Sequence, residues 1–362
     1  MTINSAINAM ANPPATLPAT SFDGRHDTTA GQIRVSSRPR KDFRWSAWVK
    51  SFELKNESPS LSFADYVMTD YQFPLCGNVN VCDNGDMVLD ATDRIARRNL
   101  PYGYERRNAG FSLGYTPVAW FVGTLSFERE NMKREHSAVE DSDEDIYKLA
   151  LDFDAGARIG IRTTFRHQER RADHYEALYF EESFPIGEAV EAAFNEGMRR
   201  FYWTDRDRDS VSLLVDWTPH EKVSIYAEGT FQDDDYTDPE TGQDIGTAFT
   251  AMEDRNFDGT DETYDILLAG RTKDETTSYT LGLAVAPAPR FNLYADYTWE
   301  KWEYGLETRY RCPGPTSASC PNALFAGVGS DGPSDNWGSD TEDDYMTASF
   351  GFEAGLTKDA KW

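Results

Sequence analysis

Hydrophobic and polar residues alternate along several stretches of the chain with a period of two, which is the period of a β-strand. In residues 291–299, Phe291 and Leu293 fall on one face, while Asn292 and Asp296 fall on the other. The same alternation recurs in three further stretches, residues 157–165, 211–217 and 223–231. We therefore expect amphipathic strands of about ten residues, the length that lets a tilted strand cross a membrane.

The strands are expected to pair as six hairpins that span residues 31–53, 108–129, 145–169, 210–232, 277–302 and 344 onward. Each hairpin contains a candidate turn with proline or glycine: Arg38-Pro39-Arg40, Thr116-Pro117, Ala155-Gly156, Thr218-Pro219-His220, Pro287-Ala288-Pro289 and Gly355. Proline and glycine favour the backbone angles of a tight reversal. Six hairpins predict eleven strands and the start of a twelfth.

Long polar connections separate the hairpins at residues 54–107, 170–209, 233–276 and 303–343. Aromatic residues mark both ends of the apolar faces, with Trp217 and Phe291 beside short turns and Phe231 and Trp299 beside long loops. Short turns at one end, long loops at the other and aromatic residues at both interfaces are typical of outer-membrane barrels.

The expected fold is therefore all-β, an antiparallel up-and-down transmembrane β-barrel. It is partial, with about 11–12 strands, short periplasmic turns and long extracellular loops. Residues 1–28 are expected to form a lead-in loop and residues 29–362 the barrel. The alternative is a soluble β-sandwich, which would bury one face of the same strands.

Composition and the absence of known motifs argue against several classes of function. The 36 Lys and Arg residues face 62 Asp and Glu residues, a formal net charge of −26, which argues against binding nucleic acid. No window approaches eighteen consecutive apolar residues, so a transmembrane helix is not expected. The five histidines lie in dissimilar contexts, and no nucleophile elbow, phosphate loop or H-E-x-x-H motif occurs, so we do not expect an enzyme.

The four cysteines form two close pairs, Cys76 with Cys82 and Cys312 with Cys320, each in a loop rich in glycine, proline, asparagine or serine. Local disulfides in an oxidising compartment are the favoured interpretation. A metal site or free thiols are the alternatives, and neither pair has C-x-x-C spacing. No C-x-x-C-H motif occurs, so the chain is not expected to attach haem of its own.

One acidic stretch matches the spacing of an EF-hand calcium loop. Its candidate ligands are Asp254, Asn256, Asp258, Thr260, Glu262 and Asp265. Calcium prefers such oxygen donors, but position 12 of the loop carries Asp in place of Glu, and the flanks do not look helical. A solvated acidic loop is the favoured alternative. Residues 185–201 predict a short helix within a loop.

Three short motifs carry a resemblance to a known family: Leu17-Pro18-Ala19-Thr20-Ser21-Phe22-Asp23-Gly24, Ser37-Arg38-Pro39 and Leu100-Pro101-Tyr102-Gly103-Tyr104-Glu105-Arg106-Arg107-Asn108. Together with the repeated Y-T-P and W-T-P turns, they resemble the MtrB/PioB family of decahaem-associated outer-membrane proteins. The resemblance covers most of the chain, through motifs that are short and degenerate.

The resemblance implies a large barrel that sheathes a periplasmic multihaem c-type cytochrome, with haem carried only by that partner, in an outer membrane of lipid and lipopolysaccharide. Its lumen would be polar. Alternation places a set of candidate lumen residues on the polar faces: Arg44, Ser46, Trp48, Lys50, Arg158, Arg162, Arg166, Asp216, Glu228 and Asp296.

Family barrels carry roughly twice this number of strands and begin with an export signal, so the sequence is expected to be a fragment. The main rival function is a porin or substrate channel closed by twelve strands. A third possibility is an acidic secreted β-protein that binds calcium or surfaces.

Overall fold

The structure is a computed structural model of the 362-residue chain. It describes residues 19, 21–66, 95–156, 158–176, 197–253, 262–309 and 336–355. Within these residues the fold is all-β. None of the described segments forms a helix long and apolar enough to cross a membrane.

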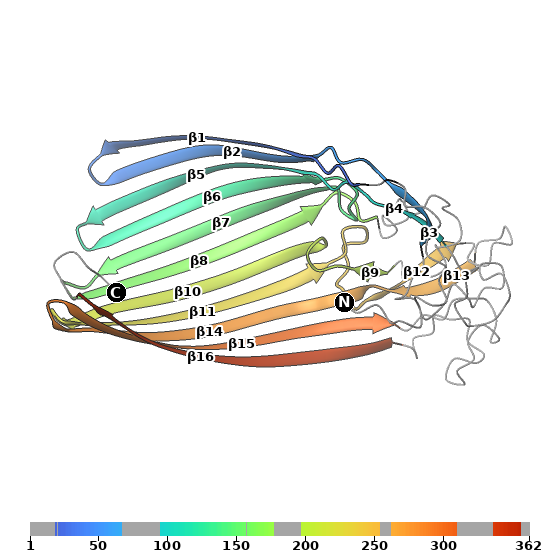
Figure 1. The fold of residues 1–362 in the computed structure, drawn as a ribbon. Coiled ribbons are helices and arrows are strands. Elements are labelled where there is room, and N and C mark those ends of the chain that lie inside the picture. The colour runs from blue at the N-terminus through green and yellow to red at the C-terminus, as the bar shows by residue number, and fades with distance from the viewer. Residues whose placement is uncertain are drawn as a thin grey trace.

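Eleven long strands form one curved antiparallel sheet, in which each strand pairs with its neighbour along the chain (Figure 1). The strands are β1 (His26–Arg40), β2 (Phe43–Asn56), β5 (Tyr104–Val118), β6 (Phe121–Arg134), β7 (Asp141–Asp154), β8 (Ile159–Ala172), β10 (Asp205–His220), β11 (Val223–Thr237), β14 (Ala269–Ala288), β15 (Phe291–Arg309) and β16 (Asn336–Ala354). The up-and-down order and the strand number agree with the prediction.

The short connections gather at one end of the sheet, which we call the short-turn end, and most longer ones gather at the opposite loop end (Figure 1). One connection at the loop end is short, because only residues 135–140 separate β6 from β7. The predicted asymmetry of the two ends is otherwise confirmed.

Four prolines of the predicted turns lie just before the reversals, within β-bulges, whereas Pro289 lies in a loop. The pairs Ser37–Trp45 and Arg40–Phe43 enclose one residue more on β1 than on β2, and Pro39 occupies that bulge. Pro117, Pro219 and Pro287 take the same position in three other hairpins. Proline has no N–H to donate to a ladder, which suits it to a bulge. The loops themselves are residues 41–42, 119–120, 155–158, 221–222 and 289–290.

The strands are longer than the predicted ten residues. β7 contains 14 residues and β14 contains 20. The extra residues lie mostly toward the loop end, where the outward side chains become charged, as in Arg129, Asp145 and Lys273. The predicted length of about ten residues was based on apolar alternation. This alternation ends where the outer face becomes polar, although the strands continue.

Smaller elements lie at the loop end: β3 (Ser62–Tyr66) pairs with β4 (Ile95–Arg98), β12 (Ala248–Glu253) pairs with β13 (Glu262–Leu267), and β9 (Met198–Arg199) runs parallel to β14. The helix predicted over residues 185–201 is wrong at its end, because β9 occupies that position; residues 185–196 lie outside the described residues. Two small buried clusters, one around Val139 and Tyr175 and one around Tyr236 and Leu268, form here.

The described sheet is open, because β1 and β16 are its two edges and each pairs with a single strand. Unpaired backbone groups cost several kcal/mol each in hydrocarbon, so a sheet of this kind within a membrane needs partner strands at both edges.

Candidate functional site

The convex face of the sheet is apolar and exposed. Leu125 is 51% exposed, Leu281 is 56% exposed and Phe350 is 74% exposed. A soluble sandwich would bury these side chains against a second sheet, and a soluble monomer rarely exposes so large a contiguous apolar area. The exposure excludes the sandwich and requires an apolar surrounding.

Aromatic residues mark the edge of this apolar band toward the loop end. The rings of Phe111, Phe127 and Tyr147 stand side by side on β5, β6 and β7, with centroids 5.9 Å and 5.1 Å apart. Further along the sheet, Tyr279 stacks on Trp299 with centroids 5.7 Å apart. Such a row is typical of the aromatic girdle at a membrane interface.

The loop-end edge of the apolar band shifts toward the short-turn end, in steps of two residues, from one strand to a later one. Tyr147 pairs with His167, and Phe165 takes the aromatic position two residues nearer the short-turn end. Phe231 pairs with Thr277, and Tyr279 again lies two residues nearer that end. Strands that are tilted in a membrane produce this shift, because a band parallel to the membrane plane crosses successive strands at different residues.

The aromatic residues nearer the short turns form a second row. The rings of Phe121 and Phe153 lie 4.9 Å apart, and Trp217 is exposed near its turn. The predicted positions of Trp217 and Phe291 are therefore confirmed. Phe231 and Trp299 lie at the other edge of the band, but not beside loops, since their strands continue to 237 and 309.

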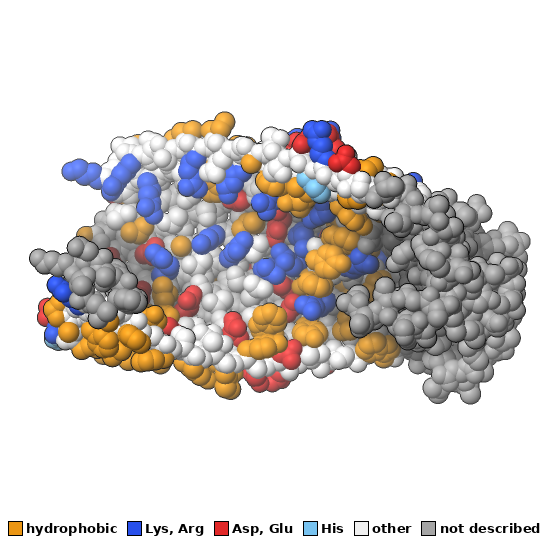
Figure 2. All heavy atoms as spheres, viewed as in Figure 1, with side chains coloured by type: hydrophobic (Ala, Val, Ile, Leu, Met, Phe, Trp, Pro, Cys, Tyr) orange, Lys and Arg blue, Asp and Glu red, His pale blue; other side chains and the backbone are white. Residues whose placement is uncertain are grey.

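The concave face carries the polar half of the alternation (Figure 2). Nine of the ten candidate lumen residues lie on its strands, and the ladders place them on this face: Arg44, Ser46, Trp48, Lys50, Arg162, Arg166, Asp216, Glu228 and Asp296. Arg158 lies instead in the β7–β8 turn, where it donates to the carbonyl of Pro219 at 3.1 Å.

Large side chains on this concave wall lie across glycines of the neighbouring strand. Trp48 is paired with Gly110, and a Cβ built on Gly110 would come within 2.6 Å of the indole. The indole Nε1 donates to Glu128 on β6 at 2.9 Å, so Trp48 spans the whole width of β5. Sequence reasoning assigned Trp48 to the lumen but missed the glycine that receives it.

Three more pairs repeat this arrangement. Arg44 lies across Gly114 and donates to Thr124 at 3.4 Å, and the Tyr226 ring lies across Gly282. The Tyr226 hydroxyl donates to Asp296 at 2.7 Å, again two strands away. The fourth pair is Tyr294 over Gly351. A glycine opposite a ring leaves room for that ring to lie flat on the sheet.

We expect Gly110→Val to lower the free energy of unfolding by about 1–3 kcal/mol, the usual cost of forcing extra atoms into a packed contact. The new side chain would displace the Trp48 indole and break its bond to Glu128. Urea unfolding in detergent micelles measures the effect. Gly123→Val is the control, because the nearest atom to a Cβ there is 3.5 Å away. Equal effects of the two substitutions would contradict the packing role.

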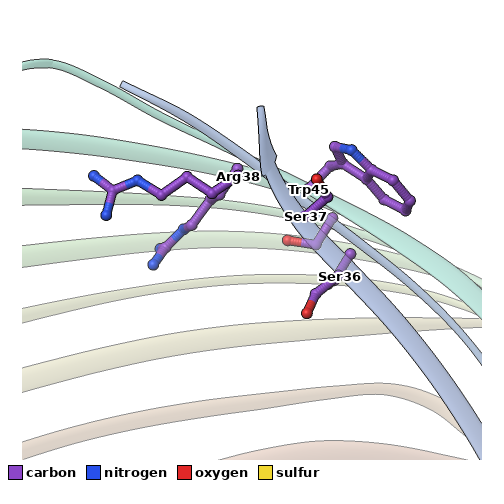
Figure 3. Close-up of a pocket in the computed structure, with 7 residues that line it drawn as sticks. Ser36, Ser37, Arg38 and Trp45 are labelled. Atoms are coloured by element: carbon purple, nitrogen blue, oxygen red, sulfur yellow. The ribbon is translucent and has the colours of Figure 1, made fainter. Parts of the chain in front are cut away.

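A hollow of about 460 Å³ opens near the short-turn end of the wall (Figure 3). Its lining combines Trp45 with polar residues, including Ser36, Arg38, Arg44 and Ser112. The hydroxyl and guanidinium groups extend the polar concave wall to the edge strand β1. They supply hydrogen-bond donors to the hollow.

Arg170 fastens a loop to the wall at the loop end. Its guanidinium is buried and donates to the carbonyls of Phe201, Tyr202 and Thr204, at distances of 2.6 to 3.1 Å. Burial lowers the pKa of Arg170 to about 10, with a further contribution from the nearby charge of Arg206. The side chain therefore stays protonated at neutral pH and holds residues 201–204 in place.

Arg170→Leu is expected to release this segment, because three carbonyls lose a charged donor and each such loss costs about 1–3 kcal/mol. We expect chymotrypsin to cleave near Phe201 and Tyr202 at least several-fold faster. The measurement is limited proteolysis of the barrel in micelles. Arg171→Leu is the control, since Arg171 is more exposed and pairs with Asp207 at 2.6 Å. An unchanged cleavage rate in Arg170→Leu would count against the fastening role.

The remaining predicted sites are the two cysteine pairs and the acidic loop with calcium-type spacing. Cys76, Cys82, Cys312 and Cys320 lie outside the described residues, as do Asp254, Asn256, Asp258 and Thr260. Glu262 and Asp265 fall on β13. Disulfides and calcium binding stay predictions. Among the described residues, no group of three or more His, Cys, Asp or Glu side chains is arranged to hold a metal ion.

His167 and His174 do not meet in one site. His167 lies outside the apolar band, between Asp209 at 2.8 Å and Glu169 at 3.2 Å. His174 lies in the loop region and contacts Glu240 at 2.6 Å. Each histidine contacts acidic groups, and the two lie in different surroundings, as the sequence indicated.

Several solved outer-membrane proteins resemble the chain in shape. The ferric-catecholate import receptor Fiu from E. coli K12 in its open form gives a TM-score of 0.48 at 10% identity, over 95% of this chain and 54% of that chain. OmpT of Vibrio cholerae gives 0.34 at 11% identity, over 93% and 100%. A Pseudomonas aeruginosa FadL homologue gives 0.38 at 8%, over 91% and 67%. The chain spans about half the length of Fiu.

No curated protein shows significant sequence similarity to the chain. The model of the MtrB/PioB outer membrane beta-barrel porin family, in contrast, matches residues 1–252. The match covers the first eight long strands of the sheet, and it agrees with the exposed apolar band and the polar concave wall. The chain therefore belongs to the MtrB/PioB family of outer-membrane β-barrel proteins.

Proposed function

We propose that this barrel encloses a multihaem c-type cytochrome and holds it across the outer membrane, so that electrons pass between the periplasm and the cell exterior. The short turns would lie in the periplasm and the long loops outside. The chain has no C-x-x-C-H motif, so the haems would belong to the partner. The barrel would bind, orient and insulate that partner without performing catalysis.

The observation that carries this proposal is the clearance of the concave wall. Trp48, Arg44 and Tyr226 lie flat across glycines instead of projecting inward. Between them the wall presents small hydroxyl side chains, including Ser112, Ser126, Ser210, Ser212 and Thr230. This stretch of short and flattened side chains allows close contact with a protein, whereas a channel that selects small solutes gains from side chains that narrow it.

The outer face beyond the aromatic girdle would meet lipopolysaccharide. Charged pairs stand there, including Arg129 with Asp143 at 2.6 Å and Lys133 with Asp141 at 2.9 Å. Their cations suit the phosphates of the headgroups, and divalent cations such as calcium could link their carboxylates to the same phosphates.

Purification from outer membranes in mild detergent tests the proposal. We expect a haem-stained polypeptide to stay with the barrel through affinity and size-exclusion steps, in a fixed ratio to it. Recovery of barrel free of haem, from cells that produce multihaem cytochromes, would contradict the proposal.

A porin or substrate channel is the second candidate, favoured by the family description and by the charges that line the wall. It predicts a steady open conductance in planar bilayers for the barrel as it is purified from its native membrane. A sheath purified in the same way should be closed, and it should conduct only after its partner is removed.

A further inference from the structure

Some charges on the concave wall, level with the apolar band, have no partner of opposite sign, and these unpaired charges are separated by sign. Other wall charges are paired, such as Arg162 with Asp152 at 2.5 Å and Lys50 with Glu128 at 3.9 Å. Among the unpaired charges, Arg44, Lys148 and Arg166 lie on β2, β7 and β8. Three carboxylates, Asp216, Glu228 and Glu300, lie on β10, β11 and β15. Figure 2 shows the same trend toward the short-turn end, with blue side chains over the upper strands and red ones over the lower strands. The sign changes between β8 and β10.

These charges lack partners of opposite sign within the described part of the chain. Arg44 bonds only the Thr124 hydroxyl, and neither Lys148 nor Arg166 contacts a carboxylate within 4.0 Å. The three carboxylates likewise contact no cation within that distance. Lys148 is moreover paired directly with Arg166 across the ladder. Like charges directly opposite one another destabilise a sheet, so this pair costs stability.

The same sheet pairs its charges in other places. On the outer face Arg171 meets Asp207 at 2.6 Å, and at the loop end of the wall Arg206 meets Glu144 at 2.7 Å. Composition therefore does not force the separation. On the described part of the wall that lies level with the apolar band, cations without partners on β2, β7 and β8 are set against carboxylates without partners on β10, β11 and β15.

We propose that this separation fixes the rotation of the enclosed protein about the barrel axis. The occupant turns a face rich in Asp and Glu toward β2–β8, and a face with Lys or Arg toward β10–β15. Complementary potentials set orientation and exclude wrong poses. The inference rests on the proposed function, because it describes how the cytochrome sits in the barrel.

The test reverses the cations in the full chain, produced in the native outer membrane. We expect Lys148→Glu together with Arg166→Glu to reduce the cytochrome retained per barrel by at least about tenfold in moderate salt, because like charges would then face each other. The matched control, Lys133→Glu with Arg171→Glu, makes the same charge change on the outer face and should retain the cytochrome. Heat-modifiable mobility on gels confirms folding of both variants.

Photo-crosslinking in the wild-type barrel supplies a second measurement. A photoreactive residue at Ser126, which pairs with Lys148, should capture acidic peptides of the cytochrome. The same residue at Thr230, beside Glu228, should capture a different and basic set. Overlapping sets at the two positions, or full retention in the reversed variant, would overturn the inference while leaving the proposed function intact.

Failure of the wild-type barrel to retain any cytochrome would instead overturn the proposed function, and with it the inference. A steady conductance of the barrel as purified from its native membrane, with an ion selectivity that inverts in the reversed variant, would also overturn the proposed function, because it identifies a channel for small ions.

Discussion

Leu213→Arg is expected to lower the free energy of unfolding by about 2–4 kcal/mol, the cost of a cation near the bilayer midplane on the lipid face of a barrel. Leu213 is 46% exposed on the convex face and pairs with Thr163 and Gly229 in the middle of the apolar band. We expect less folded barrel in the outer membrane and a lower urea midpoint in lipid vesicles.

Leu214→Arg is the matched control, because Leu214 is the next residue on β10 and faces the concave side, between Arg162 and Glu228. A charge there meets water and a neighbouring carboxylate, so we expect a change several-fold smaller. The face assignment fails if Leu214→Arg destabilises the barrel as much as Leu213→Arg does.

The second large effect concerns the clearance of the concave wall. Ser126, Lys148, Arg166 and Ser210 form one cross-strand row on that wall. Ser126→Trp combined with Ser210→Trp should reduce the cytochrome retained per barrel at least about tenfold, since overpacking a close contact costs about 1–3 kcal/mol and 1.4 kcal/mol is tenfold in affinity. The measurement is the ratio of haem to barrel after purification.

Phe127→Trp serves as the control for this variant. Phe127 follows Ser126 on β6 and belongs to the aromatic row on the convex face, where tryptophan is favoured. It should leave retention of the cytochrome unchanged. Undiminished retention in the double tryptophan variant would show that the occupant does not touch this row.

Alternation was sufficient to predict the strands, their antiparallel order and their two faces, because a period of two fixes which side chains share a side. Val215 and Asp216 are adjacent in sequence and lie on opposite faces, as expected. The turns were predicted less well. Pro39 indicated a reversal nearby, but proline also suits a bulge, and only the ladder shows that the loop is at residues 41–42.

Cross-strand relations could not be predicted from one sequence, since they depend on register. Nothing local to Gly110 or Gly282 indicates that Trp48 or Tyr226 lies across it. The opposition of Lys148 and Arg166 has the same origin. Both lie in the hairpin predicted at residues 145–169, but only the register of β7 with β8 places them directly opposite one another.

Fluorescence quenching shows most directly which face of the strands meets lipid. Single cysteines at Leu213, Leu214, Val215 and Asp216 are labelled with a fluorophore in lipid vesicles, and two quenchers are compared. We expect a lipid-borne quencher to act on 213 and 215, and a water-soluble quencher to act on 214 and 216. Uniform quenching of all four positions by the aqueous reagent would contradict a lipid-facing convex side.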